Sequence, residues 1–212
     1  FNHLYFLDYE KEGYTDYERN HYEALHTLHQ AQVLITERSP DIAIRLLNQL
    51  VKTCNEYEFT SIGVQALTVL RDEYAKKGKL TPYKEVSDEL KQLNKLHEIH
   101  RKCDSIYHQN LVQINKSASA QNRILPRIPK SINEIKAEAK KLKSDNLYIL
   151  AAKLEILYNE IRQHFSDNIK ICTDLEKKYL NRSNREVIVN LDQDYISFTK
   201  LQSYLNLGDL KS

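Results

Sequence analysis

The chain has no methionine and no tryptophan, and it contains only four glycines and four prolines among its 212 residues. Average usage would be about 7% glycine and 5% proline. Sheet proteins need both residues at their many tight turns, and nucleotide-binding α/β folds place glycine close to phosphates. The scarcity therefore argues against both classes. Because even an initiator methionine is missing, we expect the sequence to be a fragment or a processed product, unless modified methionines have been omitted from it.

Charge, cysteine content and hydropathy exclude further classes. The formal net charge is +2, from 31 basic and 29 acidic side chains, and this near balance gives no field that favours nucleic acid or anionic membrane. No apolar run approaches the 18 or so residues needed to cross a bilayer, and the first residues do not form a secretory signal. Three cysteines, Cys54, Cys103 and Cys172, are an odd number without close spacing. This pattern predicts free thiols in a reducing compartment, the cytoplasm.

What the chain does contain favours helices. Leu, Lys, Glu and Gln are abundant, and all four have high helix propensity. Apolar residues recur every three to four positions, and stop signals such as Gly78 divide the pattern into eight segments. Thr81-Pro82 and the capping box of Ser131 and Glu134 mark two helix starts. The predicted helices cover 16–37, 41–57, 60–77, 82–115, a fifth segment that begins after Ser131, 145–165, 167–180 and 184–207.

Residues 116–130 interrupt the helical pattern. Small polar residues come first, and two prolines follow three positions apart, which is typical of a loop or linker. We therefore expect N-terminal helical hairpins over 1–115, a loop or linker over 116–130, and C-terminal hairpins over 131–212. Because the chain stops where the second helix of a hairpin should begin, we expect the native protein to continue beyond Ser212.

The breaks between segments recur at intervals of 40 to 44 residues, near 38–40, 78, 122, 166–167 and 208–209. A shift of 88 residues also takes the apolar positions of 41–57 onto those after Ser131, and those of 60–77 onto 145–165. One shift that matches two helices and the turn after them indicates stacked helical hairpins. A single hairpin cannot bury its apolar face, whereas stacked neighbours bury a continuous core.

Two segments resemble the tetratricopeptide repeat family. Tyr204 stands four residues before Gly208, and Tyr74 stands four residues before Gly78, as at the end of the first helix of a repeat. The characteristic tryptophan and small-residue pair are absent, and the spacing exceeds the usual 34 residues. The resemblance implies an all-α fold in which antiparallel helical hairpins stack as an α-solenoid. In such a superhelix the first helices line a concave groove for a protein or peptide.

A solenoid of this kind would bind its partner through polar residues on the groove helices. The sequence therefore predicts a non-catalytic scaffold for a protein or peptide, with no cofactor and with neither nucleic acid nor membrane as partner. An alternative is a peptide-sensing regulatory domain of a signalling or transcription regulator. The spacing within 60–77 and 145–165 selects the partner-binding residues Gln65, Thr68, Asp72, Lys153, Glu160 and Gln163.

The best candidate for metal chemistry lies within 82–115, where His97, His100, Cys103, Asp104 and His108 occur close together. These are zinc-ligand residue types, and three of them share one side of a helix. However, the two histidines of HEIH are three residues apart, not four as in HExxH, and no second cluster supplies further ligands. A metal-binding helical bundle is therefore a second alternative, and we prefer the interpretation of a polar helix face.

Signatures of catalysis are missing from the sequence: it contains no GxxxxGK[ST], GxGxxG or GxSxG. A lone cysteine on an apolar stripe, such as Cys172 near His164, is usually core. Most of the 14 tyrosines are interpreted as core residues with the hydroxyl at the edge. The basic stretch from Arg123 to Lys143 also contains Glu134, so it is interpreted as a solvated helix face and not as a phosphate-binding stripe.

Overall fold

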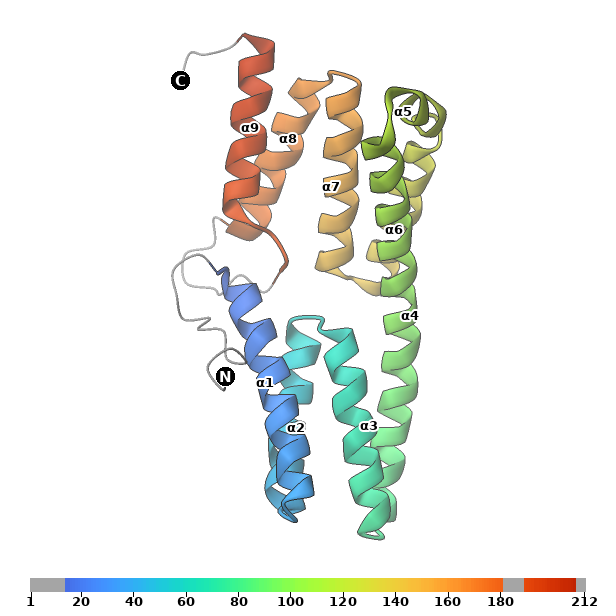
Figure 1. Ribbon diagram of the computed structural model, residues 1–212, viewed down its shortest axis with the longest axis vertical. Helices are drawn as coiled ribbons and strands as arrows, with labels where there is room; N and C mark the ends of the chain where they lie inside the picture. Colours follow the sequence, from blue (N-terminus) through green and yellow to red (C-terminus); the bar gives the residue numbers. More distant parts are fainter. Residues whose placement is uncertain (1–13, 181–188, 209–212) are drawn as a thin grey trace. The chain divides into compact units, whose positions relative to one another are not determined.

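The structure of the protein is a computed structural model that describes residues 14–180 and 189–208 (Figure 1). These residues are helical and form no strand, which confirms the all-α prediction for the described part of the chain. A π-helical turn, η2 (Glu176–Leu180), extends the eighth helix. The α-helices are α1 (Asp16–Thr36), α2 (Pro40–Glu56), α3 (Thr60–Lys76), α4 (Leu80–Lys116), α5 (Ala118–Ile124), α6 (Ile128–Leu142), α7 (Asp145–Ile161), α8 (Phe165–Leu175) and α9 (Gln193–Leu207).

Three segments differ from the sequence-based prediction. The interval 116–130 is largely helical and not a loop, because it contains α5 and the first turn of α6. α6 begins at Ile128, so Ser131 lies inside the helix; Pro129 favours this earlier start, since its fixed φ suits the first helical turn. The last helix begins at Gln193 after an Asp192 cap, and part of the predicted segment 184–207 lies outside the described residues.

The ends of the helices share one turn geometry. Left-handed backbone occurs at Arg38, Glu58, Gly78, Lys143 and Gln163, with φ between 53° and 65°. After each of them, the next N–H donates to the carbonyl five residues earlier at 2.8 to 3.0 Å, as in a Schellman motif. The five residues are spaced by 20 within 38–78 and by 20 within 143–163. The chain therefore reverses direction after helices of similar length, and the turn predicted at 166–167 lies at Gln163.

The chain divides into two compact units, residues 1–98 and 99–212, and the boundary falls within α4. In the first unit, α1 packs on α2 and α2 packs on α3. The core there includes Leu47, Ile62, Leu67 and Leu70, each no more than 1% exposed. Burying a side chain of this size contributes about 1.5–3 kcal/mol, so these helices are held mainly by their apolar stripes.

In the second unit, α7 is buried on two faces. Leu147, Ala151 and Leu154 belong to a core shared with α6 and the second half of α4, whereas Ile149 and Ile156 belong to a core shared with α8 and α9. The apolar sequence of this helix predicts burial on more than one side. None of the described helices combines the length and the hydropathy that a membrane span requires.

Candidate functional site

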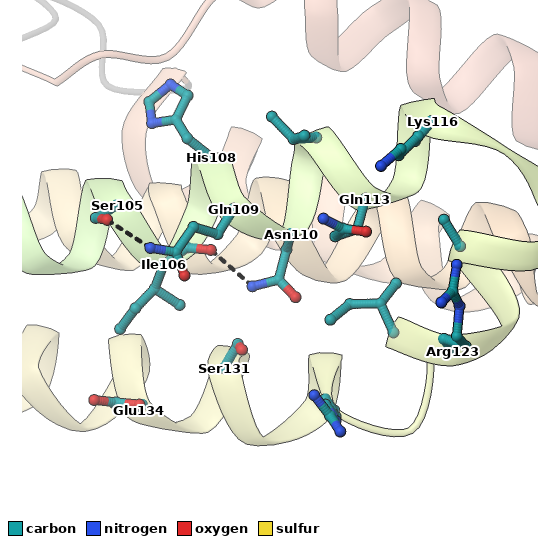
Figure 2. Close-up of a pocket in the computed structure, with 14 residues that line it drawn as sticks. Ser105, Ile106, His108, Gln109, Asn110, Gln113, Lys116, Arg123, Ser131 and Glu134 are labelled. Carbon is teal, nitrogen blue, oxygen red and sulfur yellow. Dashed lines mark hydrogen bonds between the residues drawn. The ribbon is translucent and has the colours of Figure 1, made fainter.

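The main groove of the second unit has a volume of about 970 Å³. It lies between the second half of α4, α5 and the first half of α6, and Figure 2 shows the side chains that line it. The groove is open to solvent along its length. Its lining includes amide, hydroxyl and cationic side chains together with a few apolar ones.

One face of α4 supplies most of the polar lining. Ser105, Gln109, Gln113 and Lys116 follow one another at helical spacing, so their side chains project from the same side. Gln109 Nε2 donates to Ser105 Oγ at 3.0 Å, which orients both side chains along the helix. This regular spacing places a row of hydrogen-bonding groups along one wall.

Two hydrogen bonds hold α5 against the end of α4. Ser117 caps α5 by accepting from the Ala120 N–H at 3.2 Å. Gln121 Nε2 reaches back and donates to the Ile114 carbonyl at 2.8 Å. Because α5 is short and could not persist alone, these contacts and the burial of Ala120 fix the position from which Arg123 projects.

Positive charge gathers at one end of the groove. Lys116, Arg123 and Arg127 line this end, and no ion pair joins any of them to a carboxylate in the part of the chain that the structure describes. The single contact of Arg123 is from Nε to the Ser119 carbonyl at 3.4 Å. Glu134 lies away from Lys116 and Arg123 in Figure 2, and it pairs with Lys102 at 2.7 Å.

Asn110 is the buried polar residue of the groove. Its side chain is on a residue only 4% exposed, and Nδ2 donates to the Ile106 carbonyl at 2.7 Å. Oδ1 has no hydrogen-bond partner. Figure 2 shows the side chain directed from α4 into the space between α4 and the helix that carries Ser131 and Glu134. An unsatisfied buried acceptor costs about 1–3 kcal/mol, so this oxygen is a position where a donor from a ligand would be stabilising.

The residues predicted on the third helix share one face of α3. Gln65 and Asp72 are exposed, and Thr68 is half-buried. Thr68 Oγ1 donates to the Val64 carbonyl at 2.7 Å, whereas Asp72 accepts from Arg71 at 2.9 Å. These contacts are local, and the face remains a prediction for partner binding.

The residues predicted on the sixth segment do not all share a face. Lys153 and Glu160 lie seven residues apart on α7 and are both half-buried, whereas Gln163 lies in the turn after the helix. Lys153 Nζ donates to the Asn190 carbonyl at 3.2 Å and lies 6.0 Å from the centre of the Tyr195 ring. Burial lowers the pKa of Lys153 and raises the pKa of Glu160. Ionisation of either group is therefore opposed by its surroundings.

The side chains of the metal alternative have other contacts. The Thr60 hydroxyl and His97 Nδ1 lie 2.9 Å apart, and His108 Nδ1 donates to the Asp104 carbonyl at 2.8 Å. Cys103 is fully buried in an apolar core. Within 14–180 and 189–208, no three His, Cys, Asp or Glu side chains come together in an arrangement that could hold a metal ion. The helical spacing of these residues alone does not build a site there.

The three cysteines are unsuited to nucleophilic chemistry. All are free and buried. Burial raises the pKa of the Cys54 thiol to about 12 and the pKa values of Cys103 and Cys172 to about 11. Since the thiolate is the nucleophilic form, these side chains stay protonated near neutral pH.

Comparison with known proteins adds no relative. No protein family matches the chain, and neither a curated protein nor a solved structure matches it.

The sequence-based analysis did not identify the groove. Arg123 and Arg127 were assigned to a solvated helix face, and the segment that carries them was taken as a loop. A signal was present in the amide residues of α4, since Gln109, Asn110 and Gln113 have helical spacing. What the pattern could not give is the return of α5 along α4, which depends on the side-chain hydrogen bond from Gln121.

Proposed function

We propose that this chain is a non-catalytic helical-repeat module that binds a peptide segment of a partner protein. Its helical hairpins would stack in the manner of an α-solenoid related to tetratricopeptide repeats. The five Schellman turns, spaced by 20 residues within 38–78 and 143–163, support this arrangement. Repeated hairpins of one length stack by burying the same apolar faces and expose extended surfaces.

The observation that carries the proposal is the row of amide side chains along the groove. Gln109, Asn110 and Gln113 each offer a carbonyl acceptor and an amino donor, the same two groups that a peptide backbone presents. A backbone segment in the groove could therefore pair with these amides without a specific side chain. The buried acceptor of Asn110 makes such pairing favourable, because it would satisfy an oxygen that otherwise has no donor.

The cysteines support a reducing compartment, and we place the protein in the cytoplasm. All three thiols are free, and each is buried in a separate part of the core. Buried free cysteine behaves as a small apolar residue and needs no oxidant for folding.

Position-specific crosslinking tests the function. The photoreactive residue p-benzoylphenylalanine would replace Val112, which lines the groove and is 61% exposed. A matched control would carry it at Lys177, which is exposed outside the groove. In extract from the source cells, we expect a discrete protein adduct at position 112 and none at 177, with the crosslinked peptide identified by mass spectrometry. Equal adducts at both positions, or none at position 112, would contradict the proposal.

A further inference from the structure

This inference rests on the proposed peptide binding and names the chemistry of the peptide. We propose that the groove between α4, α5 and α6 takes an acidic peptide segment. Carboxylates of the segment would pair with Arg123, Arg127 and Lys116, and a main-chain N–H would donate to Asn110 Oδ1.

The charges at the groove select an acidic ligand. Three cationic side chains from α4, α5 and the start of α6 line one end, and none has an ion pair within the described ranges. Two of them are arginines, whose planar guanidinium binds a carboxylate through two parallel hydrogen bonds. Arg123 carries only the weak contact to Ser119 at 3.4 Å, so most of its donors are available.

The buried oxygen of Asn110 selects a ligand that also carries a donor. A simple anion could pair with the arginines, but it has no hydrogen to donate to Oδ1. A peptide supplies both groups, because its backbone N–H groups recur at every residue and its acidic side chains extend beyond them. The combination of cations with an unpaired acceptor therefore favours a peptide over phosphate or free carboxylate.

The length of the wall suits a short extended segment. From Ser105 to Lys116, α4 rises about 16 Å at 1.5 Å per residue. An extended peptide covers that length with about five residues at 3.3 Å each. Val112 and Ile124 provide apolar contact beside the polar row. Figure 2 places Glu134 and Arg123 apart, so the acidic residues of the segment would lie toward the Arg123 end.

Nucleic acid fits this groove less well. Single strands are bound by stacking their bases on aromatic side chains, and no tyrosine or phenylalanine is among the described lining residues. The chain as a whole has a net charge of only +2, which gives no long-range attraction for a polyanion. The local charge of the groove is enough for a few carboxylates.

Selection from a peptide library tests the inference. A display library of random ten-residue peptides would be selected on the immobilised full chain, in parallel with the variants Arg123→Gln/Arg127→Gln and Lys140→Gln/Lys143→Gln. The second variant removes two exposed lysines that line a different, smaller pocket, and so controls for loss of charge alone. Circular dichroism would verify that each variant keeps its helices.

We expect the enriched peptides to contain at least two Asp or Glu residues. Their affinity should fall about tenfold or more in the arginine variant, as expected for loss of charge-assisted hydrogen bonds, and stay within about twofold in the lysine variant. Asn110→Ala should weaken the same peptides without changing their acidic character. Enrichment of neutral or basic peptides, or acidic peptides insensitive to the arginine variant, would overturn this inference and leave peptide binding intact. No enrichment at all would overturn both proposals.

Discussion

At the residue scale, the helix ends contain four residues in a conformation that glycine adopts more easily. Arg38 has φ 61° and is exposed, and the equivalent position two turns later is Gly78 with φ 65°. Left-handed backbone costs a residue with a Cβ about 1 kcal/mol. Arg38→Gly should therefore raise the free energy of unfolding by up to about 1 kcal/mol, and Gly78→Ala should lower it by about the same amount.

Urea denaturation followed by circular dichroism would measure both changes. A Cβ at Gly78 would meet no atom within 4 Å, so any loss there reports backbone strain and not a clash. Arg38→Ala is the matched control, because it removes the side chain but keeps the Cβ. A gain from Arg38→Ala equal to that from Arg38→Gly would assign the effect to charge and refute the strain argument.

The half-buried carboxyl of Glu160 predicts a pH-dependent change in stability. Burial raises its pKa above the ordinary value of 4.5, and both Tyr195 and Cys172 lie close enough for its charge to oppose their ionisation. The folded state therefore holds this proton more tightly than the unfolded chain. Its contribution to stability is present below pH 4.5 and is lost as the pH rises through the folded pKa.

Glu160→Gln should remove that loss. The variant should be more stable than the native chain at pH 7, and the difference should shrink as the pH falls toward 4.5. Urea titrations at several pH values would give the two curves. Asp174→Asn, which neutralises an exposed carboxylate in the same unit, should show no comparable trend. Parallel curves for native protein and Glu160→Gln would mean that the carboxyl ionises as in the unfolded chain.

At the scale of elements, Gly63 is where α3 approaches its neighbours most closely. A Cβ built there lies 2.8 Å from Leu93 Cδ2 on α4 and 3.3 Å from Cys54 Cβ on α2. The leucine methyl can rotate away, but the cysteine Cβ is fixed to its backbone. Alanine would gain about 1 kcal/mol in helix propensity. Overpacking of a dense core costs about 1–3 kcal/mol, so the net change should be a loss of stability.

A double-mutant cycle checks the cause. If the clash with Leu93 contributes, Gly63→Ala should cost less in a Leu93→Ala background than in the native chain. The coupling between these two contacting positions should be about 0.5 kcal/mol or more. Additive effects would mean that the approach of α2 at Cys54 alone limits the site, and a stabilising Gly63→Ala would show that the helices can separate without cost.

The same elements show what the sequence can predict. The apolar stripes of α1, α2, α3 and α7 repeat at helical spacing, and their predicted ranges agree with the structure to within a few residues. The turns were harder, because only Gly78 has a residue type that signals left-handed backbone; Arg38 and Gln163 do not. The register of the predicted repeat was therefore three residues off at the turn after α7.

The candidate site was less predictable than the helices. Its residues are polar and its walls are brought together by contacts between side chains distant from any motif, such as Gln121 with the Ile114 carbonyl. The predicted surface residues Gln65 and Lys153 were chosen from helical spacing alone, which gives the face of a helix but not what packs beside it. Lys153 illustrates the limit: its ammonium is partly buried and bonded to Asn190.

At the scale of the whole molecule, the division into two compact units falls inside a continuous helix. Leu96 packs in the core of the first unit, and Ile99 packs in the core of the second. Each half of α4 is thus held by the apolar residues of its own unit. A change confined to one core should then loosen the helices of that unit and leave the other protected, since cooperative unfolding follows contiguous packing.

Two matched substitutions test this independence by hydrogen exchange with mass spectrometry. Leu67→Ala and Ile135→Ala each truncate a side chain that is no more than 1% exposed, and each should cost about 2–5 kcal/mol. We expect Leu67→Ala to accelerate exchange in α1, α2 and α3 but not in α6, α7 and α8, and Ile135→Ala to do the reverse. The two halves of α4 should follow their respective units. If either substitution accelerated exchange equally in all helices, the chain would unfold as one cooperative body, and the hydrophobic clusters would have to be coupled through α4 itself.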